Sequence, residues 1–157
     1  MNRRSFWMFI MITIILVIIF WNAGGSRVKD LAPFYFKKII GETAEVEVGG
    51  FVVDSEVAST PSARQKGLSG RDYLQLDKGM LFVFPEADIW QFTMANTNFP
   101  LDIIWILDDR IVDIAHAVRP GEDMITTSAM ANYVLEIRAS IARQQGWQVG
   151  DIVNIEF

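Results

Sequence analysis

Six polar residues stand among strongly apolar stretches of the chain: Arg71, Asn96, Thr97, Asp102, Glu136 and Arg138. Burying an amide or a carboxylate among hydrocarbon side chains costs kilocalories unless each polar atom has a hydrogen-bond partner. We therefore expect these side chains to lie near one another. The planar guanidinium of Arg71 would then bind Asp102 or Glu136 through two parallel hydrogen bonds.

Two interpretations of this polar set stay open. As a ligand site, its donors and acceptors suit a carboxylate, a phosphate or sugar hydroxyl groups. As a structural network, the same groups would fix a loop to the sheet, since polar groups among buried strands usually occur in satisfied pairs. The aromatic residues between 82 and 105 are expected mainly in the core, and an exposed subset would form a platform for a carbohydrate ring.

The candidate pair of catalytic acids is Asp102 and Glu136. Two carboxyl groups at a suitable separation hydrolyse glycosides, which makes a hydrolase that uses acidic residues the alternative function. His116 is the only histidine, and no G-x-S-x-G motif accompanies it, so a serine triad is not predicted. No residue is assigned a catalytic role from the sequence.

Composition argues against several classes of partner. The chain has 14 Lys and Arg against 19 Asp and Glu, a net charge of −5, which disfavours a nucleic-acid partner because phosphate binding requires a basic face. The absence of cysteine removes disulfides and thiolate metal sites. The pairs Asp108-Asp109 and Glu122-Asp123 lack the repeated oxygen spacing of a calcium loop. We therefore expect neither a metal nor a cofactor.

The elements that position these residues are mostly strands. Alternating residues from Ala44, a Gly49-Gly50 turn and further apolar runs predict seven or eight short strands. Thr60 is the expected N-cap of one short helix, and a second is expected before Gly146. The connections look too short for parallel crossovers, which favours a mainly β (α+β) domain whose antiparallel sheet curls into a small barrel. Residues 119–132 are expected to form a polar loop, either mobile or a lid.

The N-terminal part has a different character. Residues 6–21 are apolar apart from one threonine and follow two arginines, which predicts a membrane helix within a 1–24 anchor. A signal peptide cut near Gly25 is the alternative. Residues 25–43 are then a juxtamembrane linker and 44–157 the folded domain. The short basic tail before the apolar run indicates a single-pass inner-membrane protein with its domain outside the cytoplasm.

Several motifs of residues 44–157 resemble those of the DUF192 family, also called UPF0127. They occur in the order Thr60-Pro61, Gly67-Leu68-Ser69-Gly70-Arg71, Gly79-Met80-Leu81-Phe82-Val83-Phe84-Pro85, Met94-Ala95-Asn96-Thr97, Pro100-Leu101-Asp102-Ile103, Val134-Leu135-Glu136 and Val149-Gly150-Asp151. The resemblance implies a small, mainly β domain behind a signal peptide or membrane segment. It brings no catalytic residue. One departure is Thr93, which stands where the family usually has tryptophan.

These observations predict a membrane-anchored, extracytoplasmic module that binds a small polar or carbohydrate-like ligand, or an envelope partner. The expected binding region is the neighbourhood of Arg71, Asn96 and Asp102. A cell-envelope hydrolase is the competing class. A structural accessory without a pocket is the third, and it would show a large exposed apolar patch.

Overall fold

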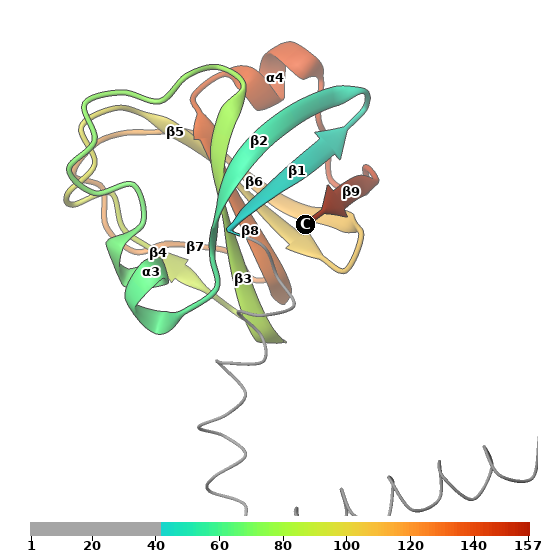
Figure 1. Cartoon of the computed structure of the whole chain (residues 1–157), viewed down its shortest axis with the longest axis horizontal. Helices are drawn as coiled ribbons and strands as arrows, with labels where there is room; N and C mark the ends of the chain where they lie inside the picture. The colour runs from blue at the N-terminus through green and yellow to red at the C-terminus, as the bar shows by residue number, and fades with distance from the viewer. Residues whose placement is uncertain (1–41) are drawn as a thin grey trace, which may run out of the picture. The chain divides into compact units, whose positions relative to one another are not determined.

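The computed structural model of the protein describes residues 42–157 (Figure 1). The predicted membrane segment at 6–21 and the linker up to residue 41 lie outside the described residues. Neither helix within 42–157 has the length and the apolar character needed to cross a membrane.

The described chain is mainly β, as predicted, with two short helices. Its elements are, in chain order, β1 (Thr43–Val48), β2 (Phe51–Ala58), α3 (Pro61–Lys66), β3 (Lys78–Asp88), β4 (Gln91–Phe92), β5 (Leu101–Leu107), β6 (Arg110–Val118), β7 (Ile125–Thr126), β8 (Ala131–Arg138), α4 (Ile141–Gln145) and β9 (Val153–Glu156).

Seven strands form one curled sheet in the order β6-β5-β8-β3-β2-β1-β9 (Figure 1). The two outer strands of this order approach each other, because Arg110 bridges Ile152 just before β9. The backbone N–H of Val153 also donates to the carbonyl oxygen of Asp109 at 2.8 Å. The sheet is therefore a half-barrel whose edges are held together at one end.

The sheet is mostly antiparallel, but one pairing corrects the expectation that the connections are too short for a parallel crossover. β2 and β3 run parallel, with Glu56 opposite Met80 and Ala58 opposite Phe82. The connection between them, residues 59–77, contains α3 and exceeds the dozen or so residues that a parallel crossover needs. This crossover covers one face of the sheet instead of turning the chain straight back, and α3 is thereby placed over β3.

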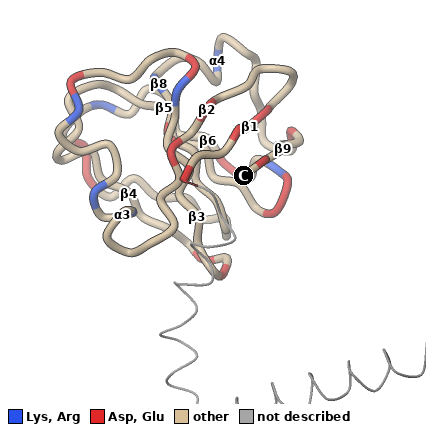
Figure 2. Tube along the Cα trace, viewed as in Figure 1, with Lys and Arg blue, Asp and Glu red and all other residues tan. Residues whose placement is uncertain are grey.

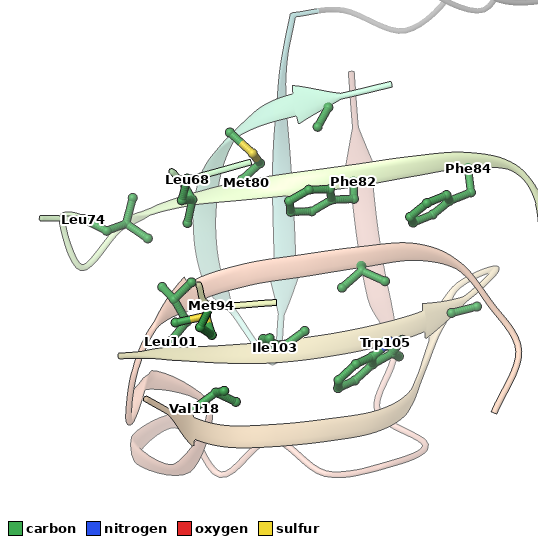
Figure 3. Close-up of a cluster of buried hydrophobic side chains, with 13 residues drawn as sticks. Leu68, Leu74, Met80, Phe82, Phe84, Met94, Leu101, Ile103, Trp105 and Val118 are labelled. Carbon is green, nitrogen blue, oxygen red and sulfur yellow. The ribbon is translucent and has the colours of Figure 1, made fainter. Parts of the chain in front are cut away.

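Side chains pack on both faces of the sheet. One face carries Phe82 and Trp105, and the crossover covers it with Leu68 (Figure 3). Residues of the opposite parity, such as Leu81 and Leu135, are fully buried as well. A polar side chain in the buried middle of β5 or β8 is therefore taken out of water, whichever face it occupies.

Residues 119–132, expected to form a polar loop that is either mobile or a lid, contain the short strand β7 and the start of β8. β7 pairs antiparallel with β4, with Gln91 opposite Thr126 and Phe92 opposite Ile125. Nearby, the N–H of Met94 donates to the carbonyl oxygen of Glu122 at 2.8 Å. This small second sheet fixes the path of the chain into residues 93–97.

Basic and acidic positions are interspersed along the described chain (Figure 2). Two of the basic residues, Arg64 and Lys66, lie in the last turn of α3. The crossover therefore carries two positive charges beside the aromatic side chains of β3, where the candidate site is found.

Candidate functional site

Glu136 is a carboxylic acid placed on an apolar face of the sheet. It lies in β8 directly opposite Met80 of β3 and Ile103 of β5, and opposed residues in a sheet point to the same face. Glu136 is 5% exposed. Within residues 42–157 its carboxyl oxygens have no hydrogen-bond partner, but they are not sealed from solvent, since the fully buried side-chain atoms without a partner belong to Trp105, His116 and Trp147. Burial raises the pKa of Glu136 to about 8, so this acid is mostly protonated at neutral pH.

The Glu136 side chain borders a pocket of about 270 Å³ between α3, β3, β4 and the 93–97 segment. Its aromatic lining comes from Phe82, Phe84, Trp90 and Phe92. Its polar and charged lining comes from Arg64, Gln65, Lys66, Ser69, Gln91, Thr93, Asn96, Thr97 and Glu136. A concave surface that combines apolar side chains with convergent polar groups is a usual form of a small-molecule site. In this pocket the polar and charged residues outnumber the aromatic ones.

The aromatic wall is held in place by ring packing and one hydrogen bond. Phe84 and Trp90 are stacked, with ring centroids 3.8 Å apart and planes 13° from parallel. Phe82 and Phe92 pack edge to face at 5.0 Å. The indole Nε1 of Trp90 donates to the carbonyl oxygen of Ala131 at 2.8 Å. The wall is thus preorganised, which lowers the cost of ordering side chains when a ligand binds.

The basic side of the pocket is equally fixed. α3 begins as predicted, with the N–H of Ala63 donating to Oγ1 of Thr60 at 3.2 Å. Arg64 Nη1 donates to the carbonyl oxygens of Ser59 at 2.7 Å and Val83 at 3.0 Å. Its guanidinium carbon lies 4.9 Å from the centroid of the Phe84 ring. One nitrogen of Arg64 therefore anchors the helix to β3, and the guanidinium remains at the pocket wall.

Asn96 and Thr97 reach the same pocket from the loop after β4. The N–H of Thr97 donates to the carbonyl oxygen of Met94 at 3.1 Å, and the carbonyl oxygen of Asn96 accepts from Gly70 at 3.1 Å. These backbone bonds tie the loop to the crossover, so the side chains of Asn96 and Thr97 are not needed to hold it. Among the predicted site residues, the structure brings Asn96, Thr97 and Glu136 together.

Asp102 does not join them, which corrects the expectation of one polar cluster. It lies opposite Ile137, one residue out of step with Glu136, and so points to the other face of the sheet. Its two carboxylate oxygens accept from the N–H of Ala117 at 2.8 Å and of Ala142 at 3.0 Å. Asp102 therefore braces the bulge in β6 and the start of α4, which is a structural role.

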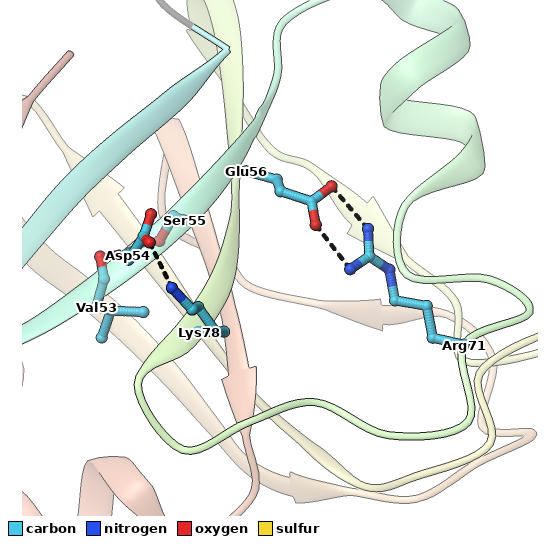
Figure 4. A network of polar contacts seen from close by, with 6 residues as sticks. All are labelled: Val53, Asp54, Ser55, Glu56, Arg71 and Lys78. Carbon is cyan, nitrogen blue, oxygen red and sulfur yellow. Dashed lines mark hydrogen bonds and ion pairs between the residues drawn. The ribbon is translucent and has the colours of Figure 1, made fainter.

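Arg71 also lies apart from the pocket. It binds the carboxylate of Glu56 through two hydrogen bonds of 2.7 Å (Figure 4), where the sequence analysis predicted Asp102 or Glu136. The hydrogen bonds from Arg71 lower the pKa of Glu56. A second pair, Lys78 with Asp54, lies beside it. The bidentate geometry was anticipated, but its partner comes from the neighbouring strand β2.

Arg138 is the third predicted residue outside the pocket. It is exposed at the end of β8 and lines a separate hollow with Phe99 and Pro100. His116 sits near Asp102, with Nδ1 4.0 Å from the carboxylate, too far for a hydrogen bond. Of the six predicted site residues, Arg71, Asp102 and Arg138 are therefore at three other places.

Arg64, Lys66 and the aromatic wall were not predicted from the sequence as pocket residues. One signal was available for Glu136: it is a single acid in the apolar run Val134-Leu135-Glu136-Ile137, in step with Val134. Period-two parity places it with Val134 on a buried face. Nothing in the sequence indicates that the crossover brings α3 to that face.

The comparisons with known proteins concern residues 44–155, which match the model of the DUF192 family, described as "Uncharacterized ACR". A crystal structure of a protein of unknown function from Novosphingobium aromaticivorans DSM 12444 is similar. It has 34% identity and a TM-score of 0.66, and the match covers 71% of this chain and 83% of that one. No curated protein matches.

A second similar structure is from Sinorhizobium meliloti 1021 and is described as a "putative transcription regulator". Its identity is 33% and its TM-score 0.65, over 72% of this chain and 92% of the other. The family model spans residues 44–155, which include every residue that lines the pocket. The chain belongs to the DUF192 family.

Proposed function

We propose that this protein is a membrane-anchored module, facing outside the cytoplasm, that binds a small polar ligand in the pocket beside Glu136. The observation that carries the proposal is a nearly fully buried carboxyl group that borders the pocket and makes no hydrogen bond within residues 42–157. Its oxygens are not sealed from solvent, so they are accessible from the pocket that Glu136 lines. A ligand in the pocket can therefore supply the hydrogen-bond partner that the protein does not.

The ligand's polar groups would meet a protonated carboxyl at Glu136 and the side chains of Asn96 and Thr97. A neutral carboxylic acid offers one O–H donor together with acceptor oxygens. The amide of Asn96 offers both donors and an acceptor, and the hydroxyl of Thr97 offers one donor. This set suits a ligand with hydroxyl or carbonyl oxygens on a flat ring, and the aromatic wall supplies the apolar contact.

Thermal shift of the full chain in mild detergent, screened against sugars, nucleotides and small ring acids, tests the proposal. A ligand that binds only the folded state raises the unfolding midpoint. Asn96→Ala should reduce that rise, because the Asn96 side chain lines the pocket while its backbone makes the structural bond. Asn154→Ala on β9, an exposed asparagine outside the pocket, is the matched control. Equal rises in the two variants would contradict binding here.

The outward orientation rests on the basic N-terminal tail and apolar run of the sequence. Protease added to intact spheroplasts should digest residues 42–157. Complete protection, with digestion only after lysis, would reverse the topology. Recovery of the intact product in the soluble cytosolic fraction would overturn the anchor.

An acid-dependent hydrolase is the second candidate, and one observation favours it: a protonated carboxyl group at neutral pH is what a general acid requires. A mechanism that uses both acids does not fit this arrangement, since Asp102 and Glu136 point to opposite faces of the sheet. Glu136 is the one carboxylic acid among the residues that line this pocket. Turnover of nitrophenyl glycosides that disappears in Glu136→Gln would establish the hydrolase over the binding module.

A further inference from the structure

We infer that the pocket selects a small ring that carries a carboxylate, with the ring on the aromatic wall and the carboxylate toward Arg64 and Lys66. This inference rests on the proposed function and names its ligand class. Three observations lead to it: the size of the pocket, the distribution of charge around it and the unpartnered Glu136.

The size of the pocket limits the ligand to about one ring. At about 270 Å³ it lies just below the usual range for drug-sized ligands, roughly 300–1,000 Å³. Phe84 and Trp90 form a stacked pair, and Phe82 and Phe92 stand edge to face. Such surfaces accept the face of an aromatic ring or the apolar face of a sugar ring.

The charges that line the pocket are two cations and one acid. Arg64 and Lys66 come from α3, and Glu136 comes from β8. The lining residues of β3, β4 and the 93–97 segment carry no charge. The two cations therefore enter the pocket from the crossover helix, and the acid enters it from the sheet.

The two cations and Glu136 would contact different groups of the ligand. With Glu136 protonated, the pocket lining carries a net positive charge in a chain whose net charge is −5. Arg64 uses Nη1 on two carbonyl oxygens, and its other guanidinium nitrogens have no partner among the described residues. They can donate to a carboxylate. The protonated carboxyl group of Glu136 then donates its O–H to a hydroxyl or carbonyl oxygen on the ring.

A cationic ligand is the main competitor, because acids and aromatic rings also bind ammonium groups. An ammonium ion would have to bind in a pocket that is also lined by Arg64 and Lys66, and Glu136 would have to lose its proton to form an ion pair with it. A further acid, Asp123, accepts a hydrogen bond from the lining residue Thr93. Asp123 is exposed, so solvent screens its attraction. The local charge therefore favours the anion.

The test uses matched probes on the full chain in mild detergent, by isothermal titration calorimetry. The aromatic set is 4-hydroxybenzoate, 4-hydroxybenzyl alcohol and 4-hydroxybenzylamine, which share one ring and differ in charge. The sugar set is glucuronate, methyl glucoside and glucosamine. We expect the carboxylate of one set to bind about tenfold or more tightly than its neutral and cationic counterparts. The set whose carboxylate binds more tightly than its counterparts identifies the ring of the ligand as aromatic or as a sugar.

Two variants test whether the carboxylate of the ligand binds beside α3. Lys66→Gln should weaken carboxylate binding about two- to fivefold, as expected for an exposed charge, and added salt should reduce that difference. Arg143→Gln is the control, since Arg143 is also an exposed basic residue in the last turn of a short helix and does not line the pocket. Equal weakening in both variants would overturn the assignment to α3.

Glu136→Gln separates the ligand classes. For the carboxylate, affinity of the wild type should fall between about pH 6 and about pH 9 as Glu136 ionises. The glutamine variant, which still donates a hydrogen bond, should bind with little pH dependence.

Tightest binding by an amine, abolished in Glu136→Gln, would overturn this inference and leave the proposed function standing. Tightest binding by a neutral probe would do the same. Failure of all six probes and of the wider screen would overturn both.

Discussion

The strongest test of the buried acid is the pH dependence of stability in Glu136→Gln. The pKa of Glu136 is about 8 in the folded state, against 4.5 as its ordinary value. Between these values the folded state binds more protons than the unfolded state, so the free energy of unfolding falls as pH rises. Below about pH 4.5 and above about pH 8 the contribution of Glu136 is constant.

The expected size follows from the shift. Each pKa unit corresponds to about 1.4 kcal/mol, so Glu136 lowers the free energy of unfolding by about 3 kcal/mol at about pH 7 and about 5 kcal/mol above pH 8. A domain is typically stable by about 5–15 kcal/mol, so this is a large share. Glutamine removes the titration and adds a buried amide, whose cost is independent of pH.

The assay is urea unfolding of the full chain at several pH values, followed by tryptophan fluorescence, since Trp105 is fully buried. The difference in unfolding free energy between Glu136→Gln and wild type should rise by about 1.4 kcal/mol per pH unit across this interval and then level off. Glu86→Gln, an exposed glutamate of β3 outside the pocket, is the control for lost charge. Parallel pH curves for wild type and Glu136→Gln would refute the buried, unpartnered carboxyl.

Three further substitutions test the structural assignments by urea unfolding. Asp102→Asn should cost about 1–3 kcal/mol, because an amide can accept from only one of the two backbone N–H groups that the carboxylate now satisfies; wild-type stability would contradict the bracing role. Arg71→Met should cost about 1 kcal/mol or less, since the pair with Glu56 is partly exposed, and a larger loss would mean that this pair holds the crossover. Gly79→Ala should cost about 1–3 kcal/mol or more, since a Cβ there would lie 2.9 Å from the carbonyl oxygen of Glu136; unchanged stability would show that the strands move apart.

Local features were predictable because their causes are local. Thr60 caps α3 through a bond that spans three residues. The turn at Asp108 places an aspartate at a φ of 56°, a conformation that Asp and Asn adopt more readily than most residues. The alternation of Leu101, Ile103 and Trp105 on one face was equally visible in the sequence. Each of these depends on neighbours within a few positions.

The pocket was not predictable in the same way, because residues from 64 to 136 build it. Its position depends on the parallel pairing of β2 with β3, which sends residues 59–77 across the sheet. Hydrophobic periodicity shows that a strand exists but does not say which strand lies beside it. In the sequence, Arg64 and Lys66 are therefore indistinguishable from the basic residues of an ordinary solvated helix end. The crossover that places them beside the aromatic wall is visible only in the structure.

A single step of register explains why the polar set divides as it does. β5 and β8 are neighbours, and Asp102 pairs with Ile137 while Glu136 pairs with Ile103. A shift of one residue would turn both acids to the same face, since side chains alternate along a strand. In the observed register, two backbone N–H groups satisfy Asp102 on one face. Glu136 faces Met80, Ile103 and the pocket on the other, without a charged neighbour to ionise it. The same register that removes a two-carboxylate site thus leaves one neutral acid for a ligand to meet.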